Sequence, residues 1–252
     1  MGDPRGDPGR CPESPWALPP AVFARAAEHA VADADGGPSR RRALEALDEG
    51  ATVVDVGVGG GAASLPLAPP AQHLVGVDQS PDMLATFAHA ADEQGVDHLE
   101  VVGRWPDVAD EVPVADVVMC HHVAYNVAEL VPFVAALTSH ARRRVVLELT
   151  SEHPRARTNW LWRALHGIER PSVPVATDAV AVLEEMGLAV ASEEHTRPAR
   201  LWQHTPRREI VAFLRRQLCV GPERDADIDA LLGEEPEVVP QGAVTLWWDG
   251  AG

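Results

Sequence analysis

Val53-Val54-Asp55-Val56-Gly57-Val58-Gly59-Gly60-Gly61 is the stretch that decides the fold of this chain of 252 residues. Its first half is rich in valine, as in a buried strand of a parallel sheet, and its second half is a turn made of glycines. Glycine is needed in such a turn where a ligand approaches the backbone, because a Cβ atom would be in the way. We therefore expect a strand over residues 51–56 with a ligand site at its carboxyl end.

A second strand, over residues 74–77, ends in Asp78, which follows Gly57 by 21 residues. In a parallel sheet this places a carboxylate beside the glycine turn, where it can accept hydrogen bonds from the two hydroxyls of a ribose. Ser80 and Pro81 then open a helix, with serine as the N-cap and proline at the first helical position. The turn, its strand and the distal acid together predict a nucleoside-binding pocket.

Two kinds of nucleoside ligand fit this pattern. The glycines also satisfy the dinucleotide fingerprint, and the spacing to Asp78 suits NAD equally well. However, Asp55 stands two residues before the first glycine, where it would repel a pyrophosphate but would suit a ligand with an ammonium and a sulfonium group. Three prolines between residues 66 and 70 also make the next segment a poor long helix for a diphosphate. The sequence therefore favours a cationic cofactor, and an NAD(P)-dependent oxidoreductase is the alternative.

Strands alternate with helices along the middle of the chain. The clearest helix candidate is 127–141, and further strand candidates are 99–102, 115–120 and 145–149. This alternation predicts an α/β fold with a mostly parallel sheet and helices on both faces. No linker divides the chain, so we expect a flexible tail over residues 1–15 and a single domain over 16–252.

The charge balance excludes several functions. Asp and Glu number 38 against 21 basic residues, for a formal net charge of −17, and every basic residue is arginine. Without lysine, neither a Walker-type phosphate loop nor Schiff-base chemistry is possible. An acidic chain also argues against nucleic acid as a partner, because phosphate backbones are bound by clustered positive charge.

The cysteines and the N-terminus indicate the compartment. Cys11, Cys120 and Cys219 make neither a metal spacing nor a CxxC motif, so a reduced compartment is the simpler interpretation. The first 15 residues have no apolar stretch, so they are not a signal peptide. No segment is fit to span a membrane. We expect a cytoplasmic protein without a membrane partner.

Several motifs resemble those of a known family, the class I S-adenosylmethionine (SAM)-dependent methyltransferases. Asp55-x-Gly57-x-Gly59-x-Gly61 resembles its first motif, and residues 77–84 resemble its second, in which the acid holds the ribose and the methionine packs by the adenine. Residues 115–123 and 144–149 are similar to its fourth and fifth strands. The resemblance covers residues 51–150 and implies a Rossmann-like sheet of seven strands. In this family the sheet ends in an antiparallel pair, for which 188–193 and 244–248 are the candidates.

The resemblance implies SAM as cofactor and methyl transfer to a small-molecule acceptor. The expected cofactor-binding residues are Asp55, Gly57, Gly59, Gly61, Asp78, Gln79, Met83, Gly103, Arg104, Trp105 and His121. In one departure, Arg104 and Trp105 stand where many members carry an acidic residue that binds the adenine amine. Trp105 either lies against the purine or caps the core. A SAM-binding protein without transferase activity is a further alternative.

The resemblance implies that residues 120–126 form the floor under the reactive methyl group. His122 is the candidate general base, because an imidazole has an unperturbed pKa of about 6.5, and Tyr125 would orient the acceptor. Alternatively, both residues only hold the end of the strand. His121 and His122 point in opposite directions if the strand persists, so we expect no metal site from this pair. Glu148 and His153 are further candidates.

Residues 151–240 are expected to form helical insertions on the substrate side. Trp160, Trp162 and Trp202 in this region either bind an apolar or planar acceptor or belong to the core. The arginines between residues 197 and 216 fit a solvated helix face better than an anion site. The sequence indicates neither the acceptor atom nor the oligomeric state.

Overall fold

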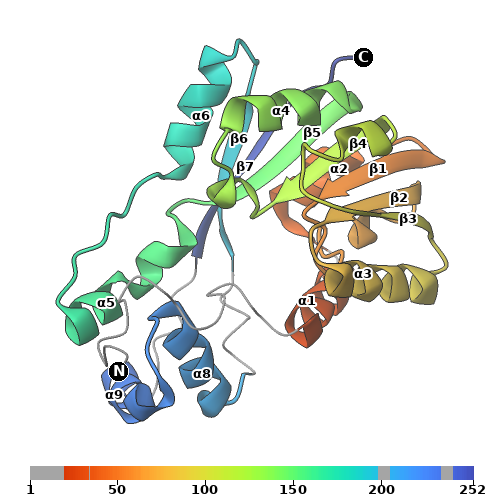
Figure 1. Ribbon diagram of the computed structural model, residues 1–252. Helices are drawn as coiled ribbons and strands as arrows, with labels where there is room; N and C mark the ends of the chain where they lie inside the picture. Colours follow the sequence, from red (N-terminus) through yellow and green to blue (C-terminus); the bar gives the residue numbers. More distant parts are fainter. Residues whose placement is uncertain (1–19, 34, 198–204, 234–240) are drawn as a thin grey trace, which may run out of the picture.

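The computed structural model describes residues 20–33, 35–197, 205–233 and 241–252 (Figure 1). In these residues seven strands form one sheet in the order β3-β2-β1-β4-β5-β7-β6. The strands are β1 (Ala51–Val56), β2 (Ala71–Asp78), β3 (Asp97–Val102), β4 (Ala115–His121), β5 (Ala141–Thr150), β6 (Ala191–Arg197) and β7 (Gln241–Asp249).

The sheet is parallel except at one edge. Strands β3, β2, β1, β4 and β5 pair in parallel, whereas β7 is antiparallel to both of its neighbours, β5 and β6. The predicted fold class, a mostly parallel sheet of seven strands with an antiparallel C-terminal pair, is therefore confirmed. The bounds of the pair differ from the prediction, because β6 begins at Ala191 and continues to Arg197.

Helices connect the strands. They are α1 (Pro20–Ala32), α2 (Gly37–Leu44), α3 (Pro81–Gln94), α4 (Leu130–Ser139), α5 (Asn159–His166), α6 (Ala176–Glu185), α8 (Arg207–Gln217) and α9 (Asp225–Leu232). Short 3-10 helices are η1 (Leu65–Leu67), η2 (Ala109–Glu111), η3 (Ala124–Asn126), η4 (Pro154–Thr158) and η5 (Pro222–Arg224). The start of α3 is as predicted: Ser80 caps it by accepting the N–H of Met83 at 3.4 Å, and Pro81 is its first residue.

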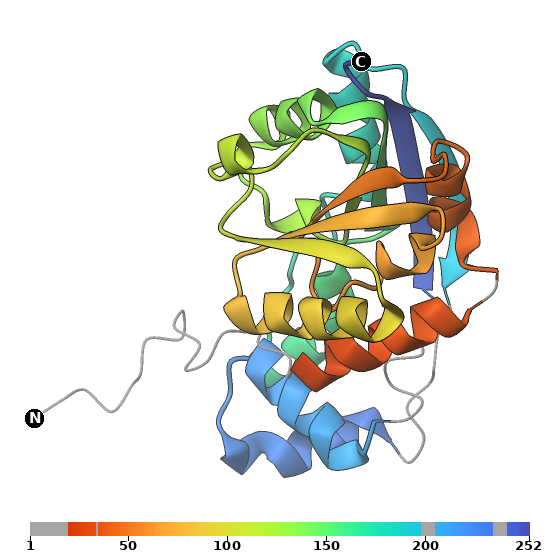
Figure 2. The ribbon, with the colours of Figure 1, turned by 90° about the vertical axis from the view of Figure 1, so that its right-hand side faces the viewer.

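The pleat of the strands divides the core into two apolar layers. Along β1, Val53 packs with residues of α2 and α3, whereas the next residue, Val54, packs with residues of α4 and α6. Phe87 of α3 and Phe133 of α4 are the largest fully buried side chains of the two layers. Figure 2 shows the strands between these two helices, with α1 running beside α3. The expected helices on both faces are thus present.

A third apolar cluster lies outside the sheet. It joins α5, α8 and α9 through buried residues such as Leu161, Leu214 and Ile228. Figures 1 and 2 show α8 and α9 beyond one end of the sheet, on the side of α1. Residues 151–240 are thus rich in helices where the structure describes them. Their role toward a substrate and the single domain over 16–252 stay predictions, and the tail over 1–15 lies outside the described residues.

Two observations bear on the expected compartment. Cys120 is a buried free thiol, and Cys219 is disulfide-bonded. Where the structure describes the chain, no helix is long and apolar enough to cross a membrane.

Candidate functional site

The glycine turn after β1 has a backbone that few other residues adopt. Gly57, Gly59 and Gly61 have φ angles of 77°, 53° and 85°, in the left-handed region. The N–H groups of Gly57 and Val58 both donate to the carbonyl oxygen of Val77, at 2.7 and 3.1 Å. The turn is therefore fixed to the end of β2, beside Asp78.

Protein atoms lie directly in front of the turn. A Cβ atom on Gly57 would lie 2.2 Å from Cγ2 of Val123, and one on Gly60 would lie 2.6 Å from the carbonyl oxygen of Phe23 in α1. Because these glycines have no side chains, the loop after β4 and helix α1 can pack directly against the turn. Tertiary packing joins the glycine turn to the segment that carries His122.

Asp78 connects the glycine turn with the start of α3. Its Oδ2 atom accepts the N–H of Gly59 at 3.1 Å, and Oδ1 accepts the N–H of Ser80 at 2.9 Å. Each carboxylate oxygen can accept a second hydrogen bond, so the half-buried side chain retains capacity for the hydroxyls of a ribose. Met83 is half-buried on the first turn of α3, and Gln79 is exposed.

Asp55 lies behind the turn. Its side chain is 1 % exposed, and its Oδ2 atom accepts a hydrogen bond from Oγ of Ser64 at 2.7 Å. Burial raises the pKa of Asp55 to about 7, the hydrogen bond from Ser64 opposes this rise, and the charge of Asp78 adds to it. Asp78 therefore lies close enough to disfavour the charged form of Asp55. Such a pair favours a cation at the turn.

The segment after β3 places Trp105 in the core. Trp105 is 5 % exposed, packs in the apolar layer of α4, and donates its indole N–H to the carbonyl oxygen of Phe133 at 3.3 Å. Its ring meets His140 edge-on. Trp105 therefore packs in the core, which is the second of its two expected roles, and its contact with the cofactor stays a prediction. Nearby, Gly103 donates its N–H to the backbone oxygen of Asp78 at 2.9 Å, and Arg104 is exposed.

The two histidines at the end of β4 diverge. His121 is the last residue of β4, and its Nε2 lies 2.5 Å from Oγ of Ser39 in α2. Burial lowers the pKa of His121 to about 4, so the imidazole is neutral at pH 7. His122 leaves the strand with a φ of 59°, a conformation that is uncommon outside glycine and is often found at functional sites.

His122 and Tyr125, the two predicted catalytic residues, lie together. Nδ1 of His122 is 3.3 Å from the Tyr125 hydroxyl, and the two rings are parallel within 10°. The hydroxyl also lies 2.8 Å from Oγ1 of Thr150 and accepts the N–H of that residue. Burial lowers the pKa of His122 and raises that of Tyr125, so both groups are neutral at pH 7. His153 meets the Tyr125 ring edge-on at 5.5 Å.

Glu148 of β5 lies behind His122. Its side chain is 7 % exposed, and its Oε1 atom is 3.3 Å from Nε2 of His122 and 3.0 Å from a guanidinium nitrogen of Arg197. Its Oε2 atom is 3.5 Å from Nε2 of His195 and accepts the hydroxyl of Thr245 at 3.4 Å. Burial alone would raise the pKa of Glu148, but the histidines and Arg197 outweigh burial and hold the pKa well below its usual range.

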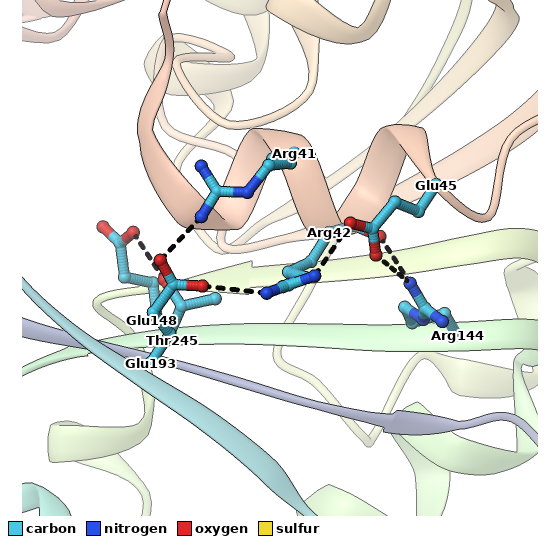
Figure 3. Close-up of polar contacts among 7 residues, drawn as sticks. All are labelled: Arg41, Arg42, Glu45, Arg144, Glu148, Glu193 and Thr245. Carbon is cyan, nitrogen blue, oxygen red and sulfur yellow. Dashed lines mark hydrogen bonds and ion pairs between the residues drawn. The ribbon is translucent and has the colours of Figure 1, made fainter.

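The register of the sheet explains this cluster. His121, Glu148, Thr245 and Glu193 are cross-strand partners in four adjacent strands, so their side chains lie on one face. Figure 3 shows Glu148, Thr245 and Glu193 in this row, where Glu193 pairs with Arg41 and Arg42 of α2 at 2.6 and 3.0 Å.

The sequence prediction omitted the β6 members of the cluster. The predicted strand ends at residue 193, and because Ser192 to Arg197 are all polar, no alternation of apolar and polar side chains marks the rest of β6. Only the pairing of β6 with β7 extends the strand to Arg197.

The predicted tryptophans are only partly described. Trp160 is 48 % exposed, and Trp162 is half-buried with the guanidinium of Arg170 at 4.8 Å from its ring centre. Trp202 lies outside the described residues. No three His, Cys, Asp or Glu side chains in the described ranges are arranged to hold a metal ion.

Comparison with known proteins adds independent observations. Residues 53–144 match the family model of a methyltransferase domain. An uncharacterized protein of Haemophilus influenzae is 31 % identical over 144 residues, which are 54 % of this chain and 53 % of that protein. The chain therefore spans about half the length of the curated relative that it matches.

Solved structures resemble the fold. A SAM-dependent methyltransferase from Thiobacillus denitrificans, in complex with S-adenosyl-L-homocysteine, aligns with a TM-score of 0.57 and 16 % identity, covering 92 % of this chain and 98 % of that chain. The YcgJ protein of Bacillus subtilis aligns with a TM-score of 0.56 and 16 % identity, covering 85 % and 98 %. Magnesium protoporphyrin IX methyltransferase from Synechocystis aligns with a TM-score of 0.55 and 16 % identity, covering 92 % and 84 %. At this identity the likeness concerns the fold.

Proposed function

We propose that the chain is a class I SAM-dependent methyltransferase that transfers the methyl group of SAM to a small-molecule acceptor; residues 53–144 match the family model of a methyltransferase domain. One observation carries the proposal: the glycine turn, Asp78 and the loop with His122 and Tyr125 meet at one edge of the sheet, because Val123 packs against Gly57. This edge holds groups suited to the cofactor on one side and groups suited to an acceptor on the other.

The residues present fit a cationic nucleoside. Asp78 would bind the ribose hydroxyls, the glycine turn would hold the methionine part, and Met83 would lie by the adenine. Asp55 would act through its charge, because its carboxylate is already bonded to Ser64. When bound, SAM supplies a sulfonium methyl group that is open to in-line displacement.

NAD(P) fits the same edge less well. The acid pair Asp55 and Asp78 would repel a pyrophosphate. In addition, the turn is followed by the short 3-10 helix η1, whereas a dinucleotide fold presents the N-terminus of a long helix to the diphosphate. These two features favour SAM over the nicotinamide alternative.

The acceptor side supports a small molecule whose reacting group is neutral. His122 would remove a proton from the acceptor, since its imidazole is neutral at pH 7 and partly exposed. Tyr125 would orient the acceptor through its hydroxyl. The formal charge of −17 argues against nucleic acid as the acceptor.

Calorimetric titration tests this function. We expect SAM to bind and NADH not to bind. Asp78→Ala should weaken SAM binding by about 1.5–3 kcal/mol, because two charge-assisted hydrogen bonds to the ribose are lost. Asp82→Ala, an exposed acid on the first turn of α3, is the matched control and should leave the affinity unchanged.

Two results would contradict the proposal: binding of NADH alone, or equal SAM affinity in the wild type and in Asp78→Ala. Tight SAM binding without transfer to any of a broad panel of acceptors would instead favour a binding protein without transferase activity.

A further inference from the structure

A positively charged cluster lies beside Tyr125, in the segment that follows β5. The ring of His153 meets the Tyr125 ring edge-on at 5.5 Å, and its Nδ1 atom accepts the backbone N–H of Arg155 at 3.1 Å. Burial lowers the pKa of His153, and the charges of Arg155 and Arg170 lower it further. The two arginines therefore lie close to the part of the site that is proposed to face the acceptor.

Two segments of the chain bring these arginines together. Arg155 belongs to η4, and Arg170 follows α5. The side-chain amide of Asn159, the first residue of α5, donates to the carbonyl oxygens of Arg170 and Pro171 at 3.2 and 3.4 Å. Burial lowers the pKa of Arg170, and the charge of Arg155 adds to this effect. The fold thus holds two like charges near each other.

Arg170 is positioned by an aromatic ring. Its guanidinium lies over the ring of Trp162, at 4.8 Å from the ring centre, and no oxygen of the described residues accepts a hydrogen bond from it. The neighbouring acid Glu169 pairs instead with Arg163, at 2.7 Å. A guanidinium stays charged at physiological pH and presents five N–H donors in a planar fork that matches a carboxylate. The ring therefore places the Arg170 guanidinium, while its N–H donors have no oxygen acceptor in the described part of the chain.

The burial of the two arginines indicates what kind of ligand would fit. Both side chains are half-buried, and burial lowers the pKa of each. Like charges that are partly removed from water cost free energy, and a bound anion would offset that cost. Elsewhere the chain supplies such anions itself, as Glu45 does for Arg42 and Arg144. At Arg170 the described residues supply only an indole ring and a second arginine.

We propose that Arg155 and Arg170 bind a carboxylate of the acceptor, which is then a hydroxy acid whose neutral hydroxyl lies by Tyr125. This inference rests on the proposed methyl transfer. The carboxylate would accept charge-assisted hydrogen bonds from both guanidinium groups. His153 joins the two ends of this acceptor site, because its ring contacts Tyr125 and its Nδ1 atom is bonded to the backbone of Arg155.

Calorimetric titration with matched pairs of ligands tests the subsite without methyl transfer. The probes are para-hydroxybenzoate, para-hydroxyphenylacetate and para-hydroxyphenylpropionate, each compared with its own primary amide. The three acids differ in the distance between hydroxyl and carboxylate. We expect at least one acid to bind at least about tenfold more tightly than its amide, because only the acid forms charge-assisted hydrogen bonds with the arginines.

Variants assign this preference to the two arginines. Arg155→Gln and Arg170→Gln should each weaken binding of the acid at least about tenfold and leave binding of the amide unchanged. Arg170→Lys, which keeps the charge but not the planar fork, should lose less of the preference. Arg163→Gln is the matched control, an exposed arginine of α5 that pairs with Glu169, and it should bind both ligands as the wild type does.

Three results would overturn the proposal. The first is a wild type that binds none of the acids more tightly than its amide. The second is an equal loss of acid and amide in Arg155→Gln and Arg170→Gln, which a purely structural role predicts. The third is weaker binding of SAM in Arg170→Gln, which would assign the arginines to the carboxylate of SAM. A wild type that prefers the acid but does not bind SAM would refute the proposed function and support the carboxylate subsite.

Discussion

Asp55 is a buried acid that, under the proposed function, would act on the cofactor through its charge. The carboxylate is almost fully buried and bonded to Ser64, yet it influences the glycine turn through its charge. A bound cation would favour the ionised form of Asp55, because it would offset the effects of burial and of Asp78. With a pKa of about 7, Asp55 is protonated in part at neutral pH, and a bound cation would shift it toward the carboxylate.

The raised pKa of Asp55 makes the stability of the protein depend on pH. The ordinary pKa is 3.8 and the folded value is about 7, so the folded state holds a proton that the unfolded state has lost between these values. The contribution of Asp55 to stability is fully present below pH 3.8 and is lost as the pH rises to about 7. Asp55→Asn removes this dependence.

Between pH 5 and pH 8 the wild type should lose stability that Asp55→Asn keeps. We therefore expect the free energy of unfolding of the variant minus that of the wild type to increase by about 1–3 kcal/mol over this range. Urea unfolding at both values measures the shift. Because only the change between the two pH values is compared, any destabilisation by the asparagine side chain that does not depend on pH cancels. Asp82→Asn is the exposed control, and a constant difference between Asp55→Asn and wild type would contradict the assigned pKa.

At the scale of elements, α1 is placed by the glycine turn. The backbone of Phe23 occupies the space that a side chain on Gly60 would fill, and α1 also packs against α3. Gly60 has no positive φ, so alanine there would be excluded by contact and not by backbone strain. A substitution at Gly60 therefore tests the packing of α1 without adding backbone strain.

Gly60→Ala should destabilise the fold by about 1–3 kcal/mol and loosen α1, because the new methyl group would lie 2.6 Å from the Phe23 oxygen. Hydrogen exchange of residues 20–32 measures the loosening. Gly187→Ala is the control, since it introduces strain at a φ of 81° without any atom within 4 Å. Unchanged exchange in α1 for Gly60→Ala would show that the helix does not depend on this contact.

At the scale of the whole molecule, arginines join distant segments of an acidic chain. Arg42 of α2 pairs with Glu45 at 2.8 Å and with Glu193 of β6 at 3.0 Å, and Arg144 of β5 pairs with Glu45 at 3.1 Å (Figure 3). These pairs are partly exposed, and such surface pairs contribute little to stability. With a net charge of −17, mutual repulsion remains the larger electrostatic effect.

Salt should therefore stabilise the protein. We expect the Tm to rise by about 2–4 °C between 20 and 300 mM NaCl at pH 8, because salt screens the repulsion between like charges. Scanning calorimetry measures the change. The same experiment at pH 5 is the control, since protonation of exposed histidines reduces the negative charge and should reduce the rise. A Tm that falls with salt at pH 8 would show that the ion pairs outweigh the repulsion.

Local sequence patterns were sufficient for the sheet and for the glycine turn. The valine run, the glycines with left-handed backbone, Asp78 at a strand end and the cap at Ser80 each depend on neighbours within a few residues. Their periodicity and backbone requirements can be recognised without the rest of the chain. For this reason the order of elements and the position of the glycine turn followed from sequence.

Tertiary structure decided which way side chains point. Trp105 lies in the core, Asp55 bonds Ser64, and Glu148 meets His195 and Arg197. The last contact exists because β7 inserts between β5 and β6, and this order of strands sets distant residues in one row. The sequence by itself determined the fold and the glycine turn, since those signals are local. The acceptor-side cluster was decided by strand order and register, which arise only when the whole sheet packs.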